Sequence, residues 1–175
     1  FVEVSGKQRL GFSGKVAVGA PKGQLGSVLL DPDDLYVGVD PGGGALPDGS
    51  DPFQANNGTN NFYVLSSSLT GDANYTLQAN HDVIFNDNVA VVSAAGKIVA
   101  ITATNNIAST GFSITTAGGA LTLNSNTLAL GAIDTGSGLL TINNAAAATQ
   151  SGVFAGSGGL TKLGVGTLTL SLANT

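Results

Sequence analysis

Three carboxylates lie close together in the stretch Leu30-Asp31-Pro32-Asp33-Asp34. Carboxylate oxygens are preferred ligands of Ca²⁺, which takes six to eight of them, so this group could suggest a calcium site. The same residues suit a turn, because an Asp side chain accepts hydrogen bonds from nearby backbone N–H groups and Pro restricts φ. We interpret Asp31, Pro32 and Asp33 as a structural turn and predict no metal site.

His81 is the single histidine of the chain. A Ser-His-Asp mechanism needs a nucleophile on a sharp turn such as Gly-x-Ser-x-Gly, and the sequence contains no such motif. We expect His81 to lie at an exposed corner beside Asn80 and Asp82. The sequence therefore predicts no catalytic residue and no bound cofactor.

Polysaccharide cleavage is the main catalytic alternative, since glycosidases need paired carboxylates across a cleft. Every acid except Glu3 is an aspartate, and most of these lie in settings typical of turns, among them Asp40, Asp48, Asp51, Asp72, Asp87 and Asp134. After residue 22 the chain has only two Lys and no Arg. We predict that the protein is not an enzyme, and keep a polysaccharide-active β-helix enzyme as an alternative because distant aspartates can still meet in space.

The charge of the chain is low and uneven. Charged residues make up 10% of the sequence, against about 25% in typical globular chains. Residues 1–22 hold four of the six Lys and Arg, whereas residues 23–175 hold two Lys and ten Asp. Nucleic acids and anionic membranes bind through several basic groups, so the acidic body argues against both partners. With no Cys, the chain can form no disulfide.

Short runs of alternating apolar and polar residues recur along the chain, each bounded by Gly, Asn, Asp or Ser. The apolar anchors Leu77, Ile101, Leu123, Ile142 and Leu163 follow one another at intervals of 24, 22, 19 and 21 residues. A strand-rich period of about 20 residues is typical of solenoids, whose units bury their apolar faces only by stacking. We predict an all-β, right-handed parallel β-helix whose interior contains these five anchors and Leu170. An antiparallel β-sandwich is the alternative.

Residues 40–62 interrupt this rhythm. They are rich in Gly, Pro and Asp and show no alternation. We expect a long excursion outside the coil, within a single β-helical segment that spans residues 1–175. Loops of this kind carry function more often than regular elements do.

Two parts of the chain resemble large secreted bacterial proteins. Residues 14–37, with Ala20-Pro21-Lys22-Gly23 and then Leu29-Leu30-Asp31-Pro32, are similar to the SAPxG turn and the LLLDPxxIxI rung of filamentous-haemagglutinin-like exoproteins. Residues 75–85 resemble the rung that usually follows. The closing GGLTKLGVGTLTLSLANT, within residues 156–175, resembles the autotransporter-associated β-strand repeat, although Leu172 stands where that repeat usually has Gly.

The resemblance implies a fragment of a bacterial adhesin that is secreted or exposed at the cell surface and associated with the outer membrane. Such a protein passes through an outer-membrane translocation barrel, by the autotransporter or the two-partner route. It implies partners among host-cell or surface glycans and proteins, and end-to-end or lateral self-association is a further expectation. A passive stalk or fibre, displaying a binding or toxin domain elsewhere in a longer chain, is the alternative.

Overall fold

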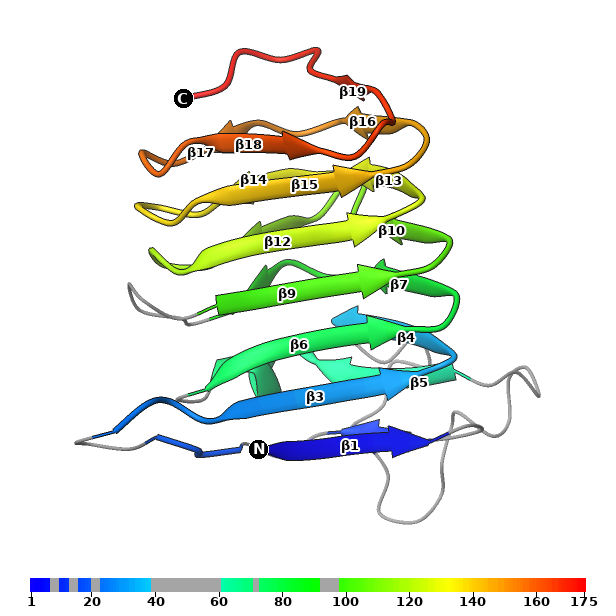
Figure 1. Ribbon diagram of the computed structural model, residues 1–175, viewed down its shortest axis with the longest axis vertical. Helices are drawn as coiled ribbons and strands as arrows, with labels where there is room; N and C mark the ends of the chain where they lie inside the picture. Colours follow the sequence, from blue (N-terminus) through cyan, green and yellow to red (C-terminus); the bar gives the residue numbers. More distant parts are fainter. Residues whose placement is uncertain (7–9, 13–15, 20–22, 39–60, 71–72, 92–97) are drawn as a thin grey trace.

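The computed structural model describes residues 1–6, 10–12, 16–19, 23–38, 61–70, 73–91 and 98–175. The chain is all-β, with 55% strand and 3% helix, and winds into a parallel β-helix of about six turns. Figure 1 shows the coil rising from the N-terminal strand to the C-terminal end with a right-handed sense. Each full turn, called a rung below, contributes strands to up to three sheets.

Sheet A has seven strands, which run in the same direction across the front of Figure 1. In spatial order they are β1 (Val2–Gly6), β3 (Ser27–Pro32), β6 (Asn74–Ala79), β9 (Ile98–Ala103), β12 (Ala120–Ser125), β15 (Leu140–Asn144) and β18 (Leu160–Leu163). Alternation within these strands places apolar residues on the inner face and Thr or Asn on the outer face.

Sheets B and C close the coil behind sheet A. Sheet B contains β19 (Leu168–Thr169), β16 (Ala148–Gln150), β13 (Thr127–Leu130), β10 (Asn106–Ala108), β7 (Asp82–Phe85), β4 (Asp34–Gly38), β5 (Asn61–Leu65) and β2 (Leu10–Phe12). Sheet C contains β17 (Phe154–Ala155), β14 (Ala132–Asp134), β11 (Ser113–Thr115) and β8 (Val89–Ala90). A short 3-10 helix, η1 (Ser66–Thr70), follows β5.

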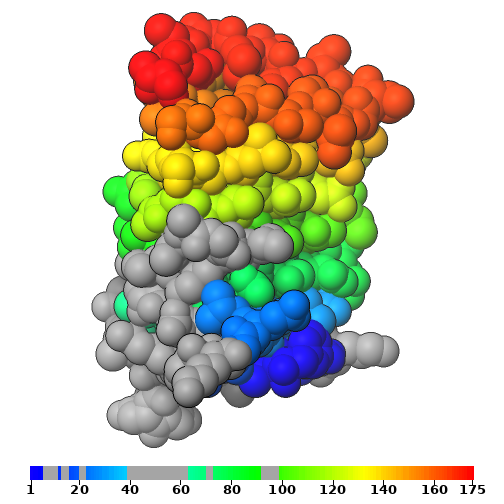
Figure 2. Space-filling view, turned by 60° about the vertical axis from the view of Figure 1, so that its left-hand side comes forward, coloured from blue at the N-terminus to red at the C-terminus, as the bar shows by residue number. Residues whose placement is uncertain are grey.

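Every strand pairing in the described part of the chain is parallel. This confirms the predicted β-helix and shows that the antiparallel β-sandwich was wrong. The stacking is visible in Figure 2, where successive rungs form bands along the axis.

The core consists of columns in which each residue lies above its equivalent in the previous rung. One column of sheet A contains Leu30, Leu77, Ile101, Leu123 and Ile142, all 0% exposed. Four predicted interior anchors, Leu77, Ile101, Leu123 and Ile142, are thus confirmed. Burial of one such aliphatic side chain contributes about 1.5–3 kcal/mol, so the columns are the main source of stability.

The predicted interior position of Leu163 is wrong, and Leu170 lines the interior of the last rung without being buried. Pairing of β18 with β15 places Lys162 over Ile142 and Leu163 over Asn143. Since alternate residues face opposite sides of a strand, Leu163 lies on the outer face and is 49% exposed. Leu170 follows β19 in the last rung, where no described strand covers it, and is 46% exposed.

The N-terminal part of sheet B contains a strand that steps backward. β5 pairs with β4 on one side and β2 on the other, so it lies between two strands that precede it in sequence. Residues 40–60 of the predicted excursion lie outside the described residues, and Asn61 and Phe62 already belong to β5. The coil therefore resumes with an inserted strand before the regular rungs begin.

Candidate functional site

The predicted turn lies at the bend between sheets A and B, called the A–B corner below. Asp31 and Pro32 end β3, Asp33 forms the bend, and β4 begins at Asp34. Stacking fixes this bend, because the carbonyl of Asp33 accepts a hydrogen bond from the His81 N–H at 2.8 Å. The Asp33 Oδ1 also accepts from Asn80 Nδ2 at 3.1 Å. The turn is therefore tied to the next rung rather than closed within itself.

Asp31 does not cap its own turn as we expected. Its Oδ1 is buried and has no hydrogen-bond partner among the described residues. Burial raises the pKa of the Asp31 carboxyl above its ordinary value, and the nearby negative charges of Glu3 and Asp33 add to this rise. This carboxylate is therefore a source of local instability at neutral pH.

His81 lies at the exposed corner that the sequence predicts, between β6 and β7. Its Nδ1 lies 3.2 Å from Asp34 Oδ1 and 3.2 Å from Asp82 Oδ2. These three residues, the His81 cluster, bring one nitrogen and two oxygen ligand atoms within 4.8 Å of one another. A protonated imidazole would pair with both carboxylates, whereas a neutral imidazole would join them as a set of ligand atoms for a divalent cation.

Neighbouring groups hold the His81 cluster in place. Asp34 Oδ1 accepts a hydrogen bond from the Asp82 N–H at 3.1 Å. Asp82 Oδ1 accepts from Asn105 Nδ2 at 2.8 Å, which links the cluster to the following rung. Sequence reasoning missed the pairing because Asp34 and His81 are 47 residues apart, and only the register of β4 with β7 brings them together.

Above the His81 cluster, the same corner carries a neutral groove of about 680 Å³. We call it the amide groove. Its lining comes from the ends of β9, β12 and β15 and from the bend after β18, and consists of Thr102, Ala103, Thr104, Asn124, Ser125, Asn126, Asn143, Asn144, Ala145, Gly164 and Val165. None of these side chains is ionisable, so the groove offers hydrogen bonds without an acid or base.

The amides of the groove form a ladder between rungs. Asn143 Nδ2 donates to Asn124 Oδ1 at 3.0 Å, and the strand register places Thr102 next in the same column. Inside the corner, Asn144 Nδ2 donates to the carbonyls of Ala146 at 2.6 Å and Thr167 at 2.9 Å. Asn144 thereby links its own bend to the bend of the next rung by a hydrogen bond.

Two buried polar atoms at the groove have no partner among the described residues, Ser125 Oγ and Asn144 Oδ1. Their residues face each other in adjacent strands and both line the groove. Buried polar groups are rarely left unpaired, and unmet hydrogen-bonding capacity of this kind is usual where a water or ligand binds. The sequence signal for the groove was the recurrence of Asn at the ends of the alternating runs, which the sequence analysis treated only as boundaries of those runs.

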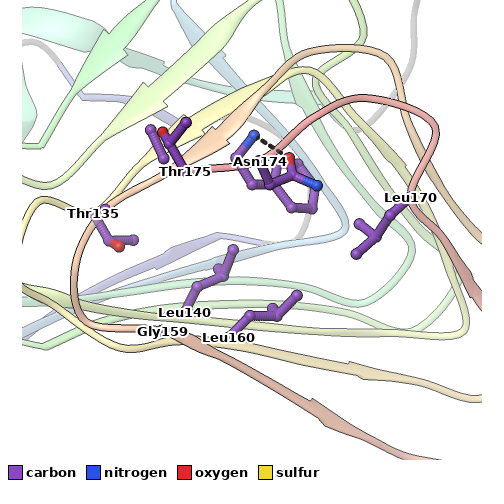
Figure 3. A pocket seen from close by; sticks show the side chains of 10 residues that line it. Thr135, Leu140, Gly159, Leu160, Leu170, Asn174 and Thr175 are labelled. Atoms are coloured by element: carbon purple, nitrogen blue, oxygen red, sulfur yellow. Dashed lines mark hydrogen bonds between the residues drawn. The ribbon is translucent and has the colours of Figure 1, made fainter.

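A second, smaller hollow of about 220 Å³ opens at the C-terminal end of the coil. Figure 3 shows Leu140, Leu160 and Leu170 beside it, with Asn174 and Thr175 opposite. Asn174 Oδ1 accepts from the Phe154 N–H at 2.8 Å, which ties the last residues to β17. The hollow is the partly filled interior of the last rung, since its apolar lining continues the core columns.

Comparison with known proteins found no matching family model, no matching curated protein and no matching solved structure. The resemblance to secreted β-helical exoproteins therefore rests on the quoted motifs. No described helix is long and apolar enough to span a membrane.

Proposed function

We propose that this chain belongs to a secreted or surface-exposed bacterial adhesin and forms a β-helical rod that attaches to host cells or other surfaces. The observation that carries the proposal is the amide groove, which offers hydroxyl and amide groups from three successive rungs. Each rung adds about 4.8 Å along the axis, so a ligand lying along the groove meets a repeating set of donors and acceptors. Many such contacts, each weak, suit adhesion to an extended polymer.

The chemistry of the groove favours neutral partners. Its lining has no charge to pair with an acidic or basic ligand, whereas Asn and Thr both donate and accept hydrogen bonds with hydroxyl groups. Glycans of cell or environmental surfaces are the partner class that fits this description best. The proposal also includes passage through an outer-membrane translocation barrel, which is supported by the motifs at residues 14–37 and 156–175.

Adherence of beads coated with the purified chain tests the proposal. We expect the beads to bind cultured epithelial cells or surfaces coated with neutral polysaccharide, and Asn124→Ala with Asn143→Ala to remove most of this adherence. The matched control is Thr122→Ala with Thr141→Ala, because these residues lie on the same strands and the same outer face but outside the groove.

Equal loss in the two double variants would contradict binding through the groove. Absence of adherence by the unsubstituted chain to any of these surfaces favours the passive stalk instead. Turnover of a polysaccharide by the purified chain would replace both readings with the enzyme alternative.

A further inference from the structure

The His81 cluster brings together ligand atoms from two rungs. Asp34 begins β4, while His81 and Asp82 lie where β6 turns into β7. Leu35 and Val83 pair in register, so Asp34 and Asp82, one residue earlier on each strand, lie side by side in sheet B. The set is thus assembled only when the two rungs stack, because 47 residues separate Asp34 from His81 in the sequence.

The distances within the cluster suit a small metal ion. His81 Nδ1 lies 3.2 Å from Asp34 Oδ1 and 3.2 Å from Asp82 Oδ2, and the three atoms lie within 4.8 Å of one another. Zn²⁺ binds His nitrogen and carboxylate oxygen at about 2.0–2.2 Å, which places neighbouring ligand atoms about 3.0–3.5 Å apart at tetrahedral or octahedral angles. The nitrogen is therefore already at the separation from each oxygen that such an ion requires.

Hydrogen bonds outside the three ligand atoms orient the carboxylates. Asp82 Oδ1 accepts from Asn105 Nδ2 at 2.8 Å, which leaves Asp82 Oδ2 facing the imidazole. Asp34 Oδ1 accepts from the backbone N–H of Asp82 at 3.1 Å. Carboxylates that bind metals are usually hydrogen-bonded in this way, because the second partner fixes the direction of the ligand oxygen.

The charges of the cluster balance only with a divalent ion. Like charges directly opposite one another on adjacent strands destabilise a sheet, and Asp34 and Asp82 are such a pair. In the described part of the chain, the ion-pair partner of both carboxylates is His81. An imidazolium carries one positive charge against two negative charges, whereas a divalent cation bound to a neutral imidazole matches both.

We propose that His81 Nδ1, Asp34 Oδ1 and Asp82 Oδ2 form a binding site for a divalent transition-metal ion of the zinc class. The nitrogen ligand favours such an ion over Ca²⁺ and Mg²⁺, which prefer sets made of oxygen alone. Three protein ligands leave a coordination position for water. This site differs from the sequence-based expectation of no metal, and it stands apart from the adhesin proposal.

A bound ion would join β4 to β7 across their long connection. Two of its ligands come from the rung of β7 and the third from the rung of β4. Because the unfolded chain does not hold these ligands together, binding favours the stacked rungs and stabilises the folded chain.

Nuclear magnetic resonance of the ¹⁵N-labelled chain tests which atom binds. His81 is the single histidine, so the imidazole nitrogen signals report on this residue alone. On titration with ZnCl₂ we expect the Nδ1 signal to shift while Nε2 keeps its proton. A shift centred on Nε2 would mean adventitious zinc on the exposed ring and would overturn the proposal.

Calorimetric titration with ZnCl₂ tests the two carboxylates. His81→Gln, Asp34→Asn and Asp82→Asn each remove one ligand, and each is expected to weaken zinc binding at least about tenfold. Asp33→Asn is the matched control, since it removes a carboxylate of the same corner that lies outside the cluster. We expect it to change the affinity less than about threefold, because salt screens exposed charges.

Thermal unfolding provides a measurement on the unsubstituted chain. With free Zn²⁺ at a hundred times its Kd, the melting temperature is expected to rise by about 5–10 °C. The same concentration of Mg²⁺ is expected to leave it unchanged. Absence of zinc binding, undiminished binding in Asp34→Asn, an equal loss in Asp33→Asn or an equal response to Mg²⁺ would each overturn the proposal.

Discussion

The bend at the A–B corner repeats from rung to rung along the coil, but its side chains are acidic in one region and neutral in another. Where β3 and β6 turn into sheet B, the corner holds the His81 cluster, with two carboxylates within 3.2 Å of the imidazole. Where β12 and β15 turn, it holds the neutral ladder of Asn124 and Asn143. The stacking of rungs therefore decides where a corner residue lies, whereas the residue type decides what that position can bind.

The two regions also differ in how the chain reaches adjacent rungs. Leu30 and Leu77 are neighbours in sheet A although 47 residues separate them, because β5 and the segment before it intervene. Leu123 and Ile142 are neighbours separated by only 19 residues. The regular part has the period that the sequence displays, whereas the N-terminal part has an equivalent core with a longer connection.

The largest expected effect comes from placing a charge in the core of the regular region. Leu123 is 0% exposed, so Leu123→Asp is expected to lower the free energy of unfolding by more than about 4 kcal/mol or prevent folding. Thr122→Asp, on the outer face of the same strand, is the control and should change it by less than about 0.5 kcal/mol. Urea unfolding followed by circular dichroism measures both. Similar losses in the two variants would contradict the assigned inner and outer faces.

A smaller loss is expected where two rungs touch through glycine. A Cβ at Gly138 would lie 2.1 Å from the carbonyl oxygen of Gly119 in the previous rung, so Gly138→Ala requires the rungs to separate locally. We expect a loss of about 2 kcal/mol in thermal or urea unfolding. Gly111 provides the control, since a Cβ there meets no atom within 4 Å and Asn tolerates its positive φ of 84°. A larger loss for Gly111→Asn than for Gly138→Ala would argue against close rung contact.

The acidic region offers a test that depends on pH. The pKa of Asp31 is raised above its ordinary value of 3.8, so the native state binds more protons than the unfolded state between 3.8 and the raised pKa. Stability contributed at this residue therefore falls as the pH rises through that window, and the loss is complete at neutral pH. Asp31→Asn is expected to stabilise the chain at pH 7, and the gain should vanish below about pH 3.8. An equal effect at both pH values would exclude ionisation as the cause.

The smallest effect is expected at the exposed corner. The His81 side chain is 63% exposed, and exposed ion pairs contribute about 0–1 kcal/mol. We expect His81→Ala to change the free energy of unfolding by less than about 1 kcal/mol, with a part that shrinks in high salt only where the imidazole carries its proton. Asn126→Ala, at the corner of the neutral region, should show no salt dependence. A large, salt-independent loss in His81→Ala would mean that packing rather than charge holds this corner.

Much of the coil was predictable because its signal is local. Alternating apolar residues at Leu77, Ile101, Leu123 and Ile142 identify the inner face of each strand without knowledge of its neighbours. Leu163 shows where this method fails. Its spacing from Ile142 fits the period, but a shift of one residue moves a side chain to the other face, and only the pairing of β18 with β15 reveals that Lys162 occupies the column.

The candidate sites were less predictable than the fold. The sequence indicated Asp33, Asp34 and His81 separately, and it showed Asn among the residues that bound the alternating runs. The sequence did not predict that Asp34 lies beside His81. No local pattern indicates how β4 and β7 are aligned across the segment between them. The sequence also did not show that Asn124 and Asn143 stand in one ladder beside Ser125 and Asn144.

The sequence by itself determined that this protein is all-β, builds its core from short alternating strands and carries almost no charge on its regular rungs, since periodicity and composition are properties of the chain alone. The tertiary structure decided which rungs touch and which corner gathers carboxylates or amides. The physical reason is that each of these depends on the register between strands that lie far apart in the sequence, such as β2 and β5, where Leu10 pairs with Phe62. That register is set by the packing of whole columns and not by any one segment.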